Sequence, residues 1–91
     1  MARAKRIYFV RVETFQPERC GWANVWIEGD SPDDALVRTR RFLRQNGWKC
    51  GKVDELGLGD PKAKGRKYYK QALIDKEVAV IYCGPSDAPE E

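Results

Sequence analysis

The sequence predicts a single α+β domain: a two-layer fold in which a four-stranded mixed sheet carries two helices on one face, in the order β-β-α-β-α-β. Three observations support this fold class. The chain has 91 residues, a length that suits one hydrophobic core. One segment, residues 31–48, combines helical periodicity with signals for both helix ends. Four further segments have the length and apolar content of strands.

The first two strands are predicted at residues 7–14 and 22–28, which are rich in β-branched and aromatic side chains. The residues between them include Pro17 and Gly21 and indicate the turn of a hairpin at 15–21.

Terminal segments flank a domain that is expected to span residues 7–84. A basic arm at residues 1–6 precedes it. The acidic segment at residues 85–91 is expected to be a disordered tail.

The helical segment has recognisable signals at both ends. Ser31 can cap its first amides, Pro32 suits the first helical position, and Asp34 stands where a capping-box acid is found. Gly47 suits the left-handed residue that ends a helix, and Trp48 can fold back onto the last turn, as in a Schellman motif. On a helical projection, the side expected to be buried contains Ala35, Leu36, Thr39, Phe42 and Leu43. The side expected to be exposed to solvent contains Arg38, Arg40, Arg41 and Arg44.

The second half of the chain is predicted to add two strands and a helix. Residues 49–56 form a weaker strand, because Gly51 interrupts it. Residues 57–67 form a loop, and residues 68–76 form a second helix. Residues 77–84 are an unbroken apolar run, which is typical of a central strand covered on both faces.

The arrangement of the helices follows from the handedness of crossover connections. Right-handed crossovers predict that the strands joined by each helix run parallel and that both helices cover one face of the sheet. The other face would then be bare in a monomer. It would expose Phe9, Trp22 and Trp26, and an apolar patch of this kind marks a partner surface.

One passage resembles a known family. From residue 22 to residue 45, a strand runs into Gly-Asp-Ser-Pro-Asp-Asp-Ala-Leu and then a helix. This passage is similar to the strand-to-helix passage of small HicB-like antitoxin domains, although only two strands precede the helix here. It covers about a quarter of the chain, and we assign no family from it.

The composition excludes several kinds of chemistry. The chain has no histidine, which removes imidazole bases, histidine-activated nucleophiles and histidine-based metal centres. The three cysteines form no Cys-x-x-Cys pair and are expected to be reduced thiols. No apolar run is long enough for a membrane span or a signal peptide, so we expect a cytoplasmic protein without a membrane partner.

A non-catalytic role without metal or cofactor is predicted. No spacing pairs two carboxylates as a catalytic site. Asp30, Asp33 and Asp34 cluster at the start of the first helix, where capping is favoured over cation binding. An enzyme that uses carboxylates or the Cys20 thiolate is the minor alternative.

The strongest functional signal is the basic segment at residues 62–70, which contains two tyrosines. The arginine side of the first helix adds a second basic surface. Cations pair with phosphates and aromatic rings stack on bases, so this pattern predicts nucleic-acid binding. The predicted contacts are Lys62, Lys64, Arg66, Lys67, Tyr68, Lys70, Arg38 and Arg41. The alternatives are a solvated loop for the segment and compensation of the helix dipole for the arginines.

The second functional prediction is protein–protein interaction or homodimerisation through the aromatic sheet face. Phe9, Trp22 and Trp26 would form that partner interface, because tryptophan is frequent among the residues that dominate binding energy. The alternative is that loops or the C-terminal segment bury these rings in the core.

Overall fold

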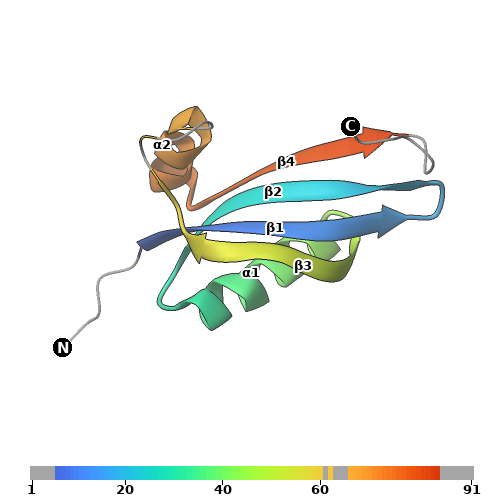
Figure 1. Cartoon of the computed structure of the whole chain (residues 1–91), viewed down its shortest axis with the longest axis horizontal. Helices are drawn as coiled ribbons and strands as arrows, with labels where there is room; N and C mark the ends of the chain where they lie inside the picture. Colours follow the sequence, from blue (N-terminus) through green and yellow to red (C-terminus); the bar gives the residue numbers. More distant parts are fainter. Residues whose placement is uncertain (1–5, 61, 63–65, 85–91) are drawn as a thin grey trace.

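The structure is a computed structural model that describes residues 6–60, 62 and 66–84. Its elements are β1 (Arg6–Gln16), β2 (Arg19–Gly29), α1 (Pro32–Gln45), β3 (Lys49–Leu58), α2 (Arg66–Asp75) and β4 (Glu77–Gly84). The four strands form one sheet with the order β3-β1-β2-β4 (Figure 1). The predicted α+β class and the predicted order of elements are confirmed.

The sheet is antiparallel throughout, so the prediction of a mixed sheet is wrong. β1 and β2 form a central hairpin, and β3 and β4 pair with its outer edges. The strands that α1 joins, β2 and β3, do run in the same direction, but β1 lies between them. The strands that α2 joins lie at opposite edges and run in opposite directions, so the rule for parallel crossovers does not govern α2.

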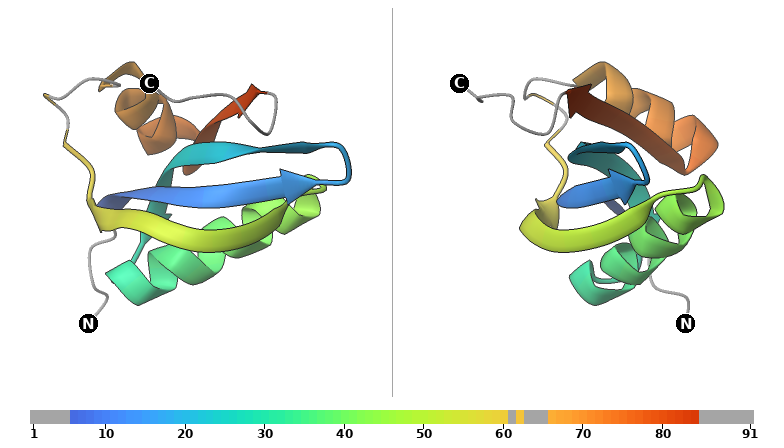
Figure 2. Two further views of the ribbon diagram at one scale, coloured as in Figure 1. Left: turned by 45° about the vertical axis from the view of Figure 1, so that its right-hand side comes forward. Right: turned by 90° about the vertical axis from the view of Figure 1, so that its right-hand side faces the viewer.

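The two helices lie on opposite faces of the sheet, which corrects the prediction of one shared face (Figure 2). α1 packs on β3, β1 and β2, over a core that includes Tyr8, Val10 and Val25. α2 packs on β4, β2 and β1, over Ile7 and Trp26. One end of the face that was expected to be bare is therefore covered by α2.

β4 is an edge strand, although its apolar run suggested a central one. Its alternate residues meet apolar groups on both faces of the sheet. Ala79 and Ile81 pack against the core under α1, whereas Val78 and Val80 pack against the cluster under α2. The unbroken apolar run thus reflects two covered faces and not a central position.

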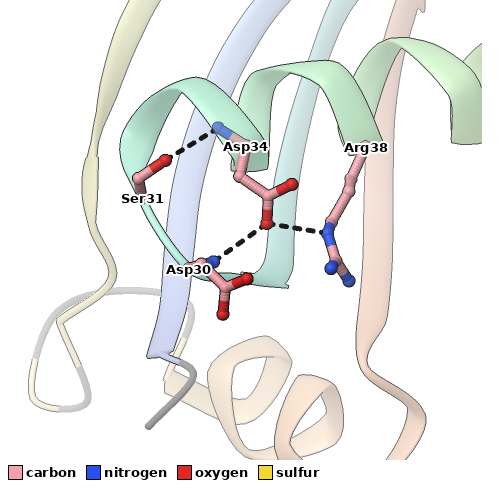
Figure 3. Close-up of polar contacts among 4 residues, drawn as sticks. All are labelled: Asp30, Ser31, Asp34 and Arg38. Atoms are coloured by element: carbon pink, nitrogen blue, oxygen red, sulfur yellow. Dashed lines mark hydrogen bonds and ion pairs between the residues drawn. The ribbon is translucent and has the colours of Figure 1, made fainter. Parts of the chain in front are cut away.

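The N-terminus of α1 is capped by side chains (Figure 3). The Ser31 hydroxyl accepts a hydrogen bond from the Asp34 amide at 3.1 Å, as predicted. Oδ2 of Asp34 accepts hydrogen bonds from the Asp30 amide and from Nε of Arg38, both at 2.9 Å. The capping acid therefore reaches one residue further back than in a standard capping box.

The C-terminus of α1 has the predicted Schellman closure. Gly47 has a φ of 86°, in the left-handed region. The Trp48 amide donates to the Leu43 carbonyl, and the Gly47 amide donates to the Arg44 carbonyl. The buried side chains of α1 are Ala35, Thr39 and Leu43, all on the stripe predicted from the sequence.

The first hairpin is longer than predicted. The paired strands continue to Gln16 and Arg19, so the turn consists of Pro17 and Glu18 and not of residues 15–21. Proline suits the first corner of a short turn, because its φ is already set.

All six elements lie between Arg6 and Gly84. The predicted basic arm and acidic tail lie outside the described residues, except for Arg6, which begins β1. Among the residues that the structure describes, no helix is long and apolar enough to cross a membrane.

Candidate nucleic-acid interface

α2 is attached to the sheet by aromatic packing. It begins at Arg66, two residues before its predicted start. The Tyr68 ring stacks on Trp26 with centroids 5.0 Å apart and planes inclined by 29°, and Trp26 is only 6% exposed. Ala72 is buried in the same cluster. These contacts hold one side of α2 against the sheet and leave the other side in solvent.

The solvent side of α2 is basic. Arg66, Lys67 and Lys70 are exposed, and so is Lys62 before the helix, whereas Lys64 lies outside the described residues. The three helical positions fall within about 100° of arc. The structure therefore brings three of the predicted cations together on one helix face, which we call the basic face of α2.

No described acidic side chain forms an ion pair with these cations. Both ion pairs in the described part of the chain lie elsewhere, one within α1 and one between β1 and β3. The neighbouring acids make other hydrogen bonds. Asp60 accepts from the Lys62 backbone amide, and Asp75 accepts from the Gln71 side chain. The charge of the basic face is thus not neutralised by a described partner.

The first turn of α2 adds positive charge to the positive end of the helix dipole. It contains Arg66 and Lys67 and no acidic residue. Cations at this end are electrostatically unfavourable, and anions are favoured there. α1 has the opposite arrangement, with Asp33 and Asp34 in its first turn. An external anion would relieve this repulsion in α2.

Tyr68, which was predicted to stack on a base, lies in an aromatic cluster of the protein itself. Besides its contact with Trp26, its ring centroid lies 5.0 Å from Nζ of Lys67. Phe9 extends the cluster, with its centroid 5.0 Å from that of Trp26. Tyr68 therefore has a role in attaching α2, and base stacking by Tyr68 stays a prediction.

The arginines of α1 do not join the basic face of α2, because α1 lies on the other face of the sheet (Figure 2). Nε of Arg38 lies 2.9 Å from Oδ2 of Asp34, so this predicted contact is part of an ion pair. Arg41 is exposed. The two basic surfaces predicted from the sequence are thus separate.

The predicted aromatic interface is divided by α2. Phe9 and Trp26 lie in the cluster under the helix. Trp22 lies outside that cluster and is partly exposed, with the Arg11 guanidinium 5.1 Å from its ring centroid. Its neighbour in register on β4, Tyr82, is 56% exposed. Only this second part of the face is open.

The sequence reasoning missed two exposed aliphatic residues of α2. Leu73 and Ile74 are 61% and 74% exposed. Adjacent helical residues are about 100° apart, so a narrow buried side that is centred on Ala72 leaves Leu73 outside it. A projection of α2 centred on Ala72 could have shown this.

The acidic residues at the start of α1 act as caps and dipole partners, with Asp34 accepting the hydrogen bonds described above. Within the described ranges, no group of three cysteine, aspartate or glutamate side chains is arranged to hold a metal ion.

No family model, curated protein or solved structure matches this chain. Its function is therefore inferred from its own residues.

Proposed function

We propose that the protein binds nucleic acid through the basic face of α2 and the lysines that precede it. The observation that carries this proposal is the group of exposed cations, Lys62, Arg66, Lys67 and Lys70, which have no described ion-pair partner. Phosphates supply the negative charge that this surface lacks, and their neutralisation releases counterions.

The electrostatics of the first turn also support the proposal. Arg66 and Lys67 stand where the helix dipole already repels cations, and that turn contains no acidic residue. Local arrangements that cost stability without a gain in packing are typical of functional surfaces. A phosphate near this turn would interact favourably with both side chains and with the helix end.

The test is fluorescence anisotropy with labelled single-stranded and duplex DNA and RNA at several salt concentrations. If Lys62, Lys64, Arg66, Lys67 and Lys70 neutralise about five phosphates on duplex DNA, log affinity falls with log salt with a slope of about −4 to −5. Absence of binding at low salt, or a slope near zero, would contradict the proposal.

A charge-matched pair of variants locates the interface. R66Q/K67Q/K70Q on α2 should weaken binding at least about tenfold and make the salt slope shallower by about 2 to 3. R40Q/R41Q/R44Q on α1 removes the same charge from the opposite face and should change affinity less than about threefold. If the α1 variant loses binding and the α2 variant keeps it, α2 is not the interface.

A second candidate function is homodimerisation through the open part of the aromatic sheet face. Trp22 and Tyr82 are neighbours in register there, and Tyr82 is 56% exposed. Aromatic residues of this kind dominate many interfaces. Light scattering after size exclusion should then give a dimer mass that Tyr82→Glu reduces to the monomer mass, and a monomer at all concentrations would exclude this candidate.

A further inference from the structure

A pocket of about 500 Å³ lies between the C-terminal half of α1 and the start of β3. Its lining residues are Arg40, Arg44, Trp48, Lys49 and Cys50. The volume is within the range of small-molecule sites. The Schellman turn of α1 joins the two sides of the pocket, because the Trp48 amide donates to the Leu43 carbonyl. The pocket is therefore built on regular elements and a closed turn.

The pocket carries three cations and no acid. Arg40 and Arg44 lie one turn apart on α1, and Lys49 begins β3. Another pocket, of about 260 Å³, lies between α1 and the connection from α2 to β4. It is lined by three basic and three acidic residues: Arg38, Arg41, Lys76, Glu28, Asp75 and Glu77, among others. Of these two pockets, the one beside Trp48 has the lining charge that favours an anion.

The remaining wall of the first pocket is uncharged. Trp48 lines the pocket and is 8% exposed, and Cys50 is half-buried. Burial raises the pKa of the Cys50 thiol above its ordinary value of 9.0, although Arg40 and Arg44 act in the other direction. The thiol is therefore protonated at neutral pH and does not repel an anion. These groups suit the apolar part of a ligand.

We propose that this pocket binds a small phosphate monoester, with the phosphate between Arg40, Arg44 and Lys49 and a compact apolar group against Trp48. Guanidinium groups pair with phosphate oxygens through two parallel hydrogen bonds. A dianion is favoured over a monoanion because three cations face it, and their attraction outweighs the repulsion from the nearby C-terminal end of α1, which is negative. This site is independent of the proposed nucleic-acid interface, which lies on the other face of the sheet.

The test uses phenyl phosphate as the probe and the alkylation rate of each cysteine, measured by peptide mass spectrometry, as the readout. At ~10 mM, phenyl phosphate should slow alkylation of Cys50 about fivefold or more, as expected for a Kd near 1 mM, and should leave Cys20 unchanged. Benzenesulfonate, a monoanion of similar shape, should protect Cys50 less at equal ionic strength. No protection of Cys50, or equal slowing of Cys20, would overturn the proposal.

Two variants of α1 with the same charge change provide the control. R40Q/R44Q should raise the Kd for phenyl phosphate about tenfold, whereas R38Q/R41Q, which changes the mixed-charge pocket, should change it less than about twofold. Each protection factor is compared with the same variant without ligand, because the arginines also affect the thiol. Equal loss in both variants would show a general charge effect and would overturn the proposal.

The phosphate pocket and the nucleic-acid interface can be refuted independently of each other. R66Q/K67Q/K70Q should keep the protection of Cys50 by phenyl phosphate, whatever its effect on nucleic-acid affinity. If this α2 variant abolishes protection of Cys50, the pocket is not the phosphate site.

Discussion

The two helices of this protein end alike but are held in different ways. Each is followed by a residue in the left-handed region, Gly47 with φ 86° after α1 and Lys76 with φ 73° after α2. Glycine adopts this conformation without a steric cost, and lysine does not. α1 also has the Ser31 cap and acids in its first turn, whereas α2 has cations there.

The helices also differ in what they bury. α1 buries Ala35, Thr39 and Leu43 in the larger core. α2 buries Ala72 and packs Tyr68 and Tyr69 against the cluster that contains Trp26, while Leu73 and Ile74 are exposed. α1 is therefore built for stability, whereas α2 exposes charge and apolar surface that contribute little to folding.

The largest expected effect is a difference in the free energy of unfolding between one substitution in α1 and one in α2. Leu43→Ala should reduce the free energy of unfolding by about 3–5 kcal/mol, because Leu43 is 1% exposed and its removal leaves a cavity. Leu73→Ala on α2 should change it by less than about 0.5 kcal/mol. Urea unfolding of both variants measures this difference, and equal losses would show that α2 packs as α1 does.

A smaller effect on stability is expected at Gly47 and Lys76, the left-handed residues that follow the two helices. Gly47→Ala should cost about 1 kcal/mol, since an added Cβ would lie 3.7 Å from Nε2 of Gln16 without a clash and the cost is that of the backbone. Lys76→Gly should stabilise the protein by about 0.5–1 kcal/mol. The backbone hydrogen bonds of Lys76 to Ala72 and Glu28 do not need its side chain.

Thermal melts of these two variants should therefore shift in opposite directions. A loss of stability in Lys76→Gly would show that the lysine side chain has a structural role that its exposure does not suggest.

The smallest expected effect is the change in the pKa of the Cys50 thiol when charges are removed from α1 or from α2. Arg40 and Arg44 lower the pKa of the Cys50 thiol, which burial raises more strongly. R40Q/R44Q should therefore raise this pKa further and move the pH midpoint of Cys50 alkylation upward, because the thiolate is the reactive form. K67Q/K70Q on α2 should leave the midpoint unchanged, since exposed charges on the opposite face are screened by salt. An equal shift in both variants would contradict this difference.

Local signals predicted α1 almost residue by residue. Ser31, Pro32 and Gly47 act within one helical turn of their own positions, so their roles do not depend on the rest of the fold. Hydrophobic periodicity likewise predicted the buried stripe in part: Ala35, Thr39 and Leu43 are buried, whereas Leu36 and Phe42 at its margins are only partly buried. The element order was predictable for the same reason.

The candidate site was predicted only in part. The basic residues of α2 were visible in the sequence, but their separation from Arg41 on α1 was not, because it depends on the face that each helix covers. The pocket between Arg44 and Cys50 was also not predicted. It exists only because the turn after α1 brings β3 back beside the helix.

The six elements, the ends of α1 and the positions of high positive charge were predictable from the sequence, because capping, periodicity and charge are properties of short segments. The antiparallel pairing of β4 with β2 and the packing of α2 on Trp26 depend on the fold of the whole chain. The local sequence of an apolar strand such as β4 does not specify which edge of the β1–β2 hairpin it joins. The choice depends on which surfaces remain to be buried once the whole chain is folded.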